Sequence, residues 1–350
     1  MLPYIIFYFL VFLLSFKIKK NKISIFDFLL ICILILFSAL RVGIGTDYKM
    51  YYVIFKNFIT VSQSATSRTG VGYSVLMYLF KNILHLNYQF LIAFAACVTI
   101  LCLYYYFKKN SDNPGKSILL YVSIGLYVSA FNGFRQNMSI AIALVGLTLF
   151  QNNKKIPSIF LLIIASLLHS STLILILCYY LFVYKKITIK PYIVFVISIF
   201  LYLSYNFVFP ILISKFAAYS GYIETNFNTT PGIGTFIIVL AYSFLYFIYF
   251  QKRKNDFSEK ENLYLNVFGV AIMAMSLQLH NWLFSRILDI FIPFIPILLA
   301  KAYTIECGKK SGKIFSLIFH VLCFIYFCVY VYSFGEVVPY SSILTQGGLR

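Results

Sequence analysis

The chain has 350 residues, of which 61% are hydrophobic, 20% aromatic and only 11% charged, with a mean hydropathy of +0.87. A soluble domain is about 25% charged, so this composition excludes an ordinary globular protein. The formal net charge is +19. Because most of the lysines fall between long apolar runs, we assign this charge to loops on one side of a membrane. We therefore expect no nucleic-acid partner.

Apolar runs near the ~20 residues that a helix needs to cross a bilayer recur along the chain. They predict an all-α fold, a polytopic transmembrane helical bundle that forms a single membrane domain over residues 1–350. The short apolar stretch 71–84 is interpreted as an interfacial or re-entrant helix, and two longer outside loops are expected at about 41–70 and 210–232. About 12 crossings are predicted, at 2–16, 25–40, 88–107, 117–134, 138–150, 156–168, 172–184, 192–209, 233–250, 263–279, 287–302 and 314–334.

Lysine and arginine fall on opposite sides of this predicted topology. Of the 23 lysines, 19 lie in loops on one side, which the positive-inside rule makes the cytoplasm. Both termini are then predicted outside, and the first apolar run is expected to be a retained helix. Five arginines also fall outside, namely Arg41, Arg68, Arg135, Arg286 and Arg350, and only Arg253 falls inside.

The first outside loop opens with Arg41 and contains two glycines, Gly43 and Gly45, that allow a tight turn. This turn would bring Arg41 close to Asp47 and to two tyrosines, Tyr48 and Tyr51. The second outside loop carries Tyr222. Aromatic and polar side chains together suit a sugar, although a belt of tyrosines at the membrane interface is the alternative reading.

Arg135 lies between two apolar helices in a connection too short to be a free loop. A guanidinium at this boundary is costly unless it reaches water or pairs with an anion, so substrate contact is predicted. A lipid phosphate or a neighbouring acid is the alternative partner.

His169 interrupts an apolar stretch, 156–184, that has lysines at both ends and must therefore turn at the outer side. A histidine at this turn can exchange a proton near neutral pH. The alternative is a histidine that bonds Ser170 or Ser171 and caps the turn.

Arg286 and Asp289 lie three residues apart, so on a helix they share a face and could form an ion pair. Asp289 is a carboxylate within an apolar run, and we expect it to orient Arg286 rather than to react. The seven cysteines form no CxxC pair, so no metal site and no cofactor are expected.

At these positions the sequence resembles the EpsG family of bacterial polysaccharide polymerases, relatives of the Wzy-type polymerases of O-antigen and capsule. The resemblance is carried, in order, by Arg41 with Gly45-Thr46-Asp47-Tyr48 and Tyr51, by Phe134-Arg135-Gln136, by His169-Ser170 and by Arg286. It implies a membrane glycosyltransferase that joins undecaprenyl-pyrophosphate-linked oligosaccharides outside the plasma membrane. It also implies a chain-length regulator protein as a partner, and sugar contact for Tyr48, Tyr51, Gln136 and Tyr222.

This chemistry requires an acceptor hydroxyl to displace lipid pyrophosphate, whose charge grows in the transition state. We expect Arg41, Arg135 and Arg286 to clamp the pyrophosphate without a metal. His169 is the expected base for the hydroxyl, and Asp47 is its rival. A single displacement inverts the anomeric carbon, whereas a covalent intermediate on Asp47 would retain its configuration.

Three other functions remain open on the sequence. A flippase for the same lipid-linked sugars should show two related halves, which we do not see. A membrane acyltransferase should carry charged or histidine residues deep in inner-side helices, where this chain offers mainly lysine. An O-antigen ligase shares the chemistry and differs only in its acceptor.

Overall fold

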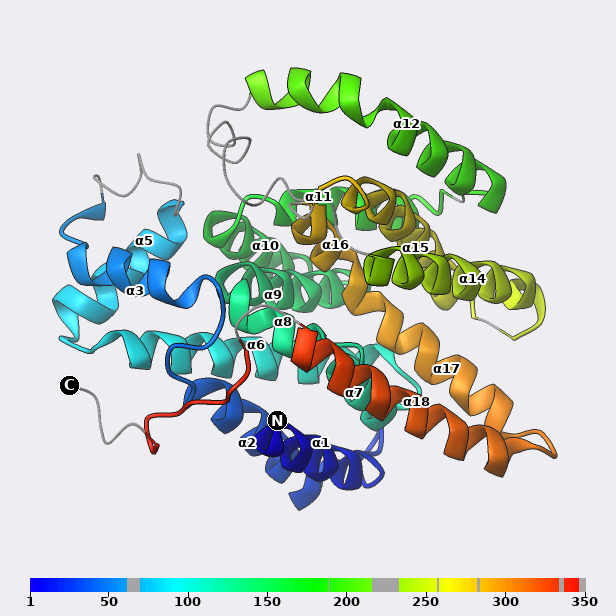
Figure 1. Cartoon of the computed structure of the whole chain (residues 1–350), viewed down its shortest axis with the longest axis horizontal. Coiled ribbons are helices and arrows are strands. Elements are labelled where there is room, and N and C mark those ends of the chain that lie inside the picture. The colour runs from blue at the N-terminus through cyan, green and yellow to red at the C-terminus, as the bar shows by residue number, and fades with distance from the viewer. Residues whose placement is uncertain are drawn as a thin grey trace. The chain divides into compact units, whose positions relative to one another are not determined.

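The computed structural model describes residues 1–61, 70–187, 189–215, 233–256, 258–281, 284–333 and 337–345, and over these ranges it is helical with isolated β-bridges but no strand (Figure 1). The chain divides into two compact units, which are described separately. The first combines Met1–Ile176 with Leu299–Arg350, and the second is Leu177–Leu298.

The first unit is built around α6 (Tyr88–Asn110), which packs against α2 and α9, while α9 packs against α10. Helices α3 and α5 lie together at the end where α6 begins (Figure 1). The other described helices of this unit are α1 (Leu2–Ser15), α2 (Ile25–Ala39), α3 (Tyr48–Asn57), α5 (Val71–Tyr78), α7 (Pro114–Ser123), α8 (Leu126–Asn132), α9 (Phe134–Gln151), α10 (Lys155–Leu168) and α18 (Gly312–Ser333). Helix α11 (Thr172–Tyr179) runs from this unit into the second, and α17 (Ile295–Cys307) returns.

The second unit is organised around α15 (Glu259–Gln278), which contacts α12, α14 and α16. Its N-terminus is closed by a capping box, in which Ser258 and Glu261 bond each other's backbone N–H groups. The other helices here are α12 (Pro191–Lys215), α14 (Ile233–Asp256) and α16 (Ser285–Phe291), with a π-helical turn at Tyr180–Tyr184 and a 3-10 turn at Ile292–Phe294.

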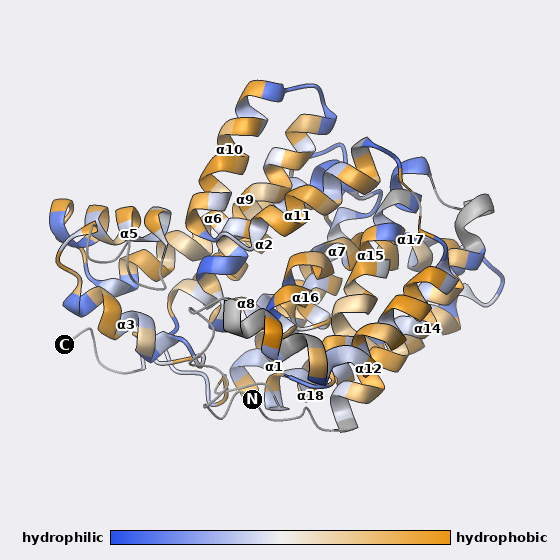
Figure 2. Ribbon diagram, turned by 90° about the horizontal axis from the view of Figure 1, so that it is seen from above, coloured by the Kyte–Doolittle hydropathy of each residue, from blue (hydrophilic) through white to orange (hydrophobic). Residues whose placement is uncertain are grey.

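Every predicted crossing coincides with a helix or a broken helix, and the all-α class is confirmed. Four helices are long and apolar enough to cross a membrane, at Tyr88–Asn110, Gly234–Gln251, Ser285–Cys307 and Gly312–Ser333. Helices α7 and α8, which meet at a bend of 53°, would together make a fifth. Apolar residues cover most helices, as Figure 2 shows. Others, such as the 14 residues of α1, rise only about 21 Å, so twelve crossings remain a prediction.

Within the outside loop predicted at 41–70, the structure has a helix that was not predicted, α3 at Tyr48–Asn57. Tyr51 and Phe55 lie one turn apart on α3 and are both buried, so tertiary packing stabilises a helix too short and too polar to be recognised alone. The predicted helix at 71–84 is present as α5 followed by a π-helical turn at Leu79–Ile83. In the second predicted loop, α12 continues to Lys215, and 216–232 lie outside the described residues.

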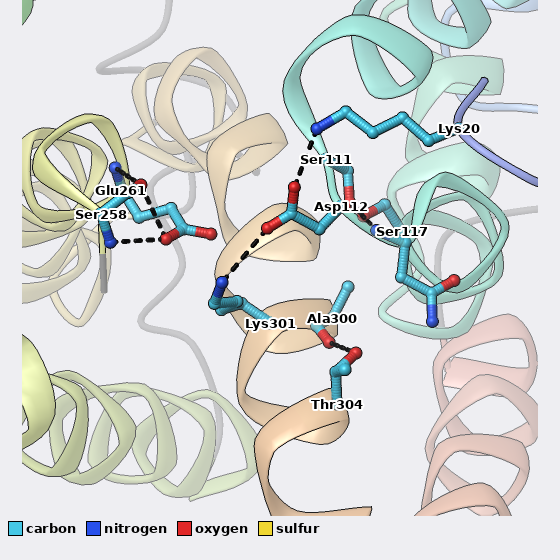
Figure 3. A network of polar contacts seen from close by, with 10 residues as sticks. Lys20, Ser111, Asp112, Ser117, Ser258, Glu261, Ala300, Lys301 and Thr304 are labelled. Atoms are coloured by element: carbon cyan, nitrogen blue, oxygen red, sulfur yellow. Dashed lines mark hydrogen bonds and ion pairs between the residues drawn. The ribbon is translucent and has the colours of Figure 1, made fainter. Parts of the chain in front are cut away.

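Helix α6 is about 34 Å long and separates two chemically different ends of the first unit. Near its C-terminus, Lys108 donates to the carbonyls of Lys19 and Lys22 and to Asp27, which is 1% exposed. Beyond the helix, Asp112 accepts from Lys20 at 2.8 Å and from Lys301 at 3.1 Å (Figure 3). Three stretches predicted to be cytoplasmic therefore meet at one end of α6.

Candidate functional site

Arg41 lies at the other end of α6 and is almost completely buried, at 2% exposure. Its Nη1 donates to the carbonyl and the hydroxyl of Ser38, and its guanidinium lies 4.6 Å from the centroid of the Phe131 ring. Among the residues that the structure describes, Arg41 forms no ion pair, and its Nε has no hydrogen-bond partner. This buried cation is therefore stabilised by a ring and by neutral oxygens rather than by a carboxylate.

Two backbone segments hold Arg41 in place. Gln89, near the start of α6, donates to the Arg41 carbonyl at 3.0 Å. Arg41 also forms a β-bridge with Ser342, so the C-terminal segment crosses beside it. A small cavity, with room for about one water molecule, adjoins its side chain and is lined in part by Ala95, Ala96, Thr99 and Tyr127.

The turn after Arg41 packs closely against the segment that precedes Arg135. Gly45 has a φ of +101°, and a Cβ there would lie 2.7 Å from the Phe131 carbonyl oxygen, so only glycine fits. The next residue, Thr46, donates its backbone N–H to the Asn132 side chain at 2.9 Å. The structure thus brings together two motifs that are 86 residues apart.

Arg135 is half-buried at the start of α9 and lies beside two aromatic rings that contact each other. Its guanidinium carbon is 5.7 Å from the Tyr51 ring centroid and 5.6 Å from that of Tyr73. A Cβ on Gly70, at the start of α5, would lie 3.9 Å from both Arg135 Nη1 and the Leu168 carbonyl oxygen. The guanidinium therefore faces the C-terminal end of α10.

His169 is the residue that follows Leu168 and caps α10, so the structure places it beside the Arg135 neighbourhood. The ring is half-buried, and its Nδ1 lies 2.6 Å from the Ser171 hydroxyl oxygen. Its backbone N–H bonds the Ala165 carbonyl. The turn predicted at this position is confirmed, and of the two serines considered there, Ser171 contacts the imidazole.

The remaining predicted residues of the first unit are close by. Asp47 is half-buried at the N-terminus of α3 and accepts a long hydrogen bond, 3.4 Å, from the Thr46 hydroxyl. Tyr48 donates to the Gln89 side chain at 3.3 Å, and Tyr51 packs edge-on against Phe134. Gln136 is buried on α9.

Arg286 and Asp289 both lie on α16 of the second unit, where each is half-buried. Their shared helix agrees with the predicted spacing, whereas their ion pair and their roles stay predictions. Tyr222 lies outside the described residues.

Sequence reasoning missed four neighbours of the arginines: Asn132, Gln89, Tyr73 and Tyr88. Two carried a signal, since Asn132 stands in the same short connection as Arg135 and Gln89 is an amide at the start of an apolar helix. The tyrosines carried none, because the chain contains 30 of them.

Comparison with known proteins gives one match. No curated protein and no solved structure is significantly similar to this chain. The family model described as EpsG family matches residues 24–342, which include Arg41, Arg135, His169 and Arg286. The chain therefore belongs to the EpsG family.

Proposed function

We propose that the protein polymerises undecaprenyl-pyrophosphate-linked oligosaccharide repeat units at the outer face of the bacterial plasma membrane. Membership of the EpsG family indicates a polysaccharide-polymerase-like role, and the apolar helices indicate a membrane protein. The observation that carries the finer proposal is the grouping of Arg41, Arg135 and His169 at one end of α6, opposite the lysines. The positive-inside rule assigns the lysine end to the cytoplasm and the arginine end to the outside.

In this proposal Arg135 contacts the pyrophosphate. It is the more accessible of the two arginines, and its flanking rings exclude water without offering a competing charge. The departing pyrophosphate gains negative charge in the transition state, and a fixed guanidinium in a partly dry site stabilises that charge most strongly. Arg286 of the second unit is proposed as a further contact.

In the observed arrangement, Arg41 contributes to the site indirectly. At 2% exposure it supports the Phe131–Asn132 segment that leads into Arg135 and adds positive potential to the site. It would touch the pyrophosphate directly only when the residues over it move apart.

His169 is proposed as the base that accepts the proton of the attacking sugar hydroxyl. The contact between its Nδ1 and Ser171 occupies that nitrogen, so proton transfer would use Nε2. Asp47, at the N-terminus of α3, remains the rival base. Direct attack by the hydroxyl would invert the anomeric carbon.

Surface polysaccharide from a deletion strain, separated on a gel, tests this function. The strain is complemented with wild type, Arg135→Ala, His169→Ala or Lys49→Ala, the last being an exposed basic residue on α3 that serves as a charge-matched control. We expect a single repeat unit in the deletion strain and in the first two variants, and a full ladder with Lys49→Ala.

The other outcomes point elsewhere. A normal ladder in the deletion strain would refute the polymerase and favour an acyltransferase. Lipid-linked units trapped inside the cell would favour a flippase. Polymer that stays on the lipid carrier and never reaches its final acceptor would favour a ligase.

A further inference from the structure

Among the buried tyrosine hydroxyls in the described part of the first unit, those of Tyr73 and Tyr88 lack a hydrogen-bond partner and belong to residues that pack against α3. Tyr73, on α5, is 0% exposed and Tyr88, at the start of α6, is 3% exposed. Neither hydroxyl bonds any residue that the structure describes. Since a buried unsatisfied polar group costs about 1–3 kcal/mol, a pair of them at one place needs a physical explanation.

The two tyrosines lie near the two arginines. The Tyr73 ring centroid is 5.6 Å from the Arg135 guanidinium carbon. Tyr88 precedes Gln89, which donates to the Arg41 carbonyl, and the Arg41 Nε is a third buried group without a partner among the described residues. Tyr73 therefore lies beside Arg135, Tyr88 lies beside the residue that bonds Arg41, and α3 packs against both tyrosines.

Neighbouring rings fix these positions. Tyr51 packs edge-on against Tyr73 at 5.6 Å, and Tyr48 packs edge-on against Tyr88 at 5.3 Å. Both come from α3, so one short helix packs against both tyrosines.

The chemistry of these groups selects a ligand rich in acceptor oxygens. Guanidinium nitrogens only donate hydrogen bonds, and each phenol has a proton to donate. Two phosphate groups joined by an oxygen offer many acceptors and enough negative charge to balance two arginines. A neutral sugar would supply donors of its own where donors are already in excess.

We propose that the hydroxyls of Tyr73 and Tyr88 donate hydrogen bonds to the pyrophosphate of the lipid-linked substrate, together with Arg41 and Arg135. That this pyrophosphate belongs to a polyprenyl lipid rests on the proposed function. The pyrophosphate would reach the site from the side of Arg135 and exposed Gly70, and α3 would have to move away from α6 to admit it. Binding then satisfies donors that are unsatisfied in the closed arrangement.

Direct binding tests this proposal without any polymerisation. The full chain in nanodiscs is titrated calorimetrically with inorganic pyrophosphate and with farnesyl pyrophosphate. We expect Tyr73→Phe and Tyr88→Phe each to weaken binding about ten- to hundred-fold, the usual effect of losing a hydrogen bond to a charged group. Tyr8→Phe is the matched control, since the buried Tyr8 hydroxyl bonds Ser123 at 3.1 Å on another helix, and it should bind as wild type does.

Thermal unfolding without added pyrophosphate supplies a second readout. Removing an unsatisfied hydroxyl should leave the melting temperature unchanged or raise it, so Tyr73→Phe and Tyr88→Phe should be at least as stable as wild type. Tyr8→Phe loses a bonded hydroxyl and should be less stable. A lower melting temperature for the first two variants with unchanged pyrophosphate affinity would overturn the proposal and indicate that water or protein bonds these hydroxyls.

The two proposals can fail separately. If deletion abolishes the polysaccharide ladder but both variants bind pyrophosphate normally, the polymerase stands and the tyrosine inference falls. If the ladder is normal without the protein but pyrophosphate binding depends on both hydroxyls, the anion site stands with another function.

Discussion

The two ends of α6 stabilise buried cations in opposite ways. At the lysine end, Lys108 meets the carboxylate of Asp27 at 2.8 Å, with Tyr104 donating to the same oxygen. At the arginine end, the Arg41 guanidinium lies over the ring of Phe131 and, among the described residues, bonds neutral oxygens of Ser38 and no carboxylate. A cation already paired with a carboxylate has little attraction left for a ligand, whereas one held by rings and dipoles keeps most of it.

Lys116 shows that packing a buried cation against aromatic rings is not sufficient to make an anion-binding site. Its ammonium lies 4.4 Å from the Phe16 ring centroid and 4.3 Å from that of Tyr303, near the lysine end. It also donates to Nε2 of His320 at 2.6 Å, because the Nδ1–H of this histidine is directed to the Ser316 carbonyl. Lys116 is thus given an acceptor by the protein itself, which the Nε of Arg41 lacks among the described residues.

The largest expected effect is on stability at the lysine end. Asp27→Ala would leave Lys108 buried beside its carbonyl partners without a counter-charge, so we expect the free energy of unfolding to fall by about 3–5 kcal/mol. Thermal or denaturant unfolding in nanodiscs measures this change. The control is Lys109→Ala, which removes the next, exposed lysine and should change little. An equally small effect of Asp27→Ala would show that the ion pair does not stabilise this end.

The next effect is on activity at the arginine end. Arg135→Ala should lower polymerisation of lipid-linked repeat units about 10²–10³-fold, the scale of losing one donor to a developing oxyanion. Its unfolding temperature should fall less than that of Asp27→Ala, because Arg135 is only half-buried and its truncation leaves no buried charge without a partner. Arg135→Lys keeps the charge but loses the forked geometry, so it should recover only part of the rate. A variant as unstable as Asp27→Ala would instead indicate a structural role.

Substitutions at two glycines test the comparison between the two ends of α6. At the arginine end, the backbone of the turn after Arg41 approaches the backbone of the segment that precedes Arg135 closely. Gly43→Ala meets no atom within 4 Å and should cost only the positive-φ strain, about 1–2 kcal/mol. Gly45→Ala has this strain as well as overlap with the Phe131 carbonyl, so about 1–3 kcal/mol more is expected. Polymerisation per folded molecule should fall with Gly45→Ala and persist with Gly43→Ala. Equal activity of the two would separate this turn from the site.

The helices were largely predictable because, in a membrane protein, apolar runs bounded by charged residues indicate helices. The predicted end of helix α6 is three residues too early, and both predicted ends of α18 lie within two residues of the observed ones. Helix α3 was not predicted, because its ten residues include Lys49, Lys56 and Asn57, and it exists through the burial of Tyr51 and Phe55. Such a helix depends on tertiary contacts that a local pattern does not contain.

The site was predictable only in part, for a related reason. Arg41 and Arg135 could be chosen because an arginine at the end of an apolar run is costly and needs a purpose. How deeply each arginine is buried could not be predicted, since the burial of Arg41 depends on the distant Phe131 and on the β-bridge to Ser342. Tyr73 could not be singled out either, because its special property is the bond that it lacks.

The smallest effect concerns pH at the lysine end. Hydrogen bonds from Lys20, and then Lys301, hold the pKa of the Asp112 carboxyl below its ordinary value of 3.8. A depressed pKa means that the ionised form is favoured in the folded state, so this stabilisation is present above about pH 4 and is lost as the pH falls further. Asp112 is 57% exposed, so solvent screening limits the contribution to less than about 1 kcal/mol.

Melting temperatures of wild type and Asp112→Asn between pH 7 and pH 3 measure this contribution. The two proteins should differ slightly at pH 7 and converge below pH 4, and raised salt should shrink the difference at pH 7. Asp27→Asn should behave differently, because Lys108 and Asp27 are buried and salt does not reach them. If salt screened both pairs equally, the carboxylates of the lysine end would all be solvent-exposed charges, and its contrast with the arginine end would rest on Arg41 alone.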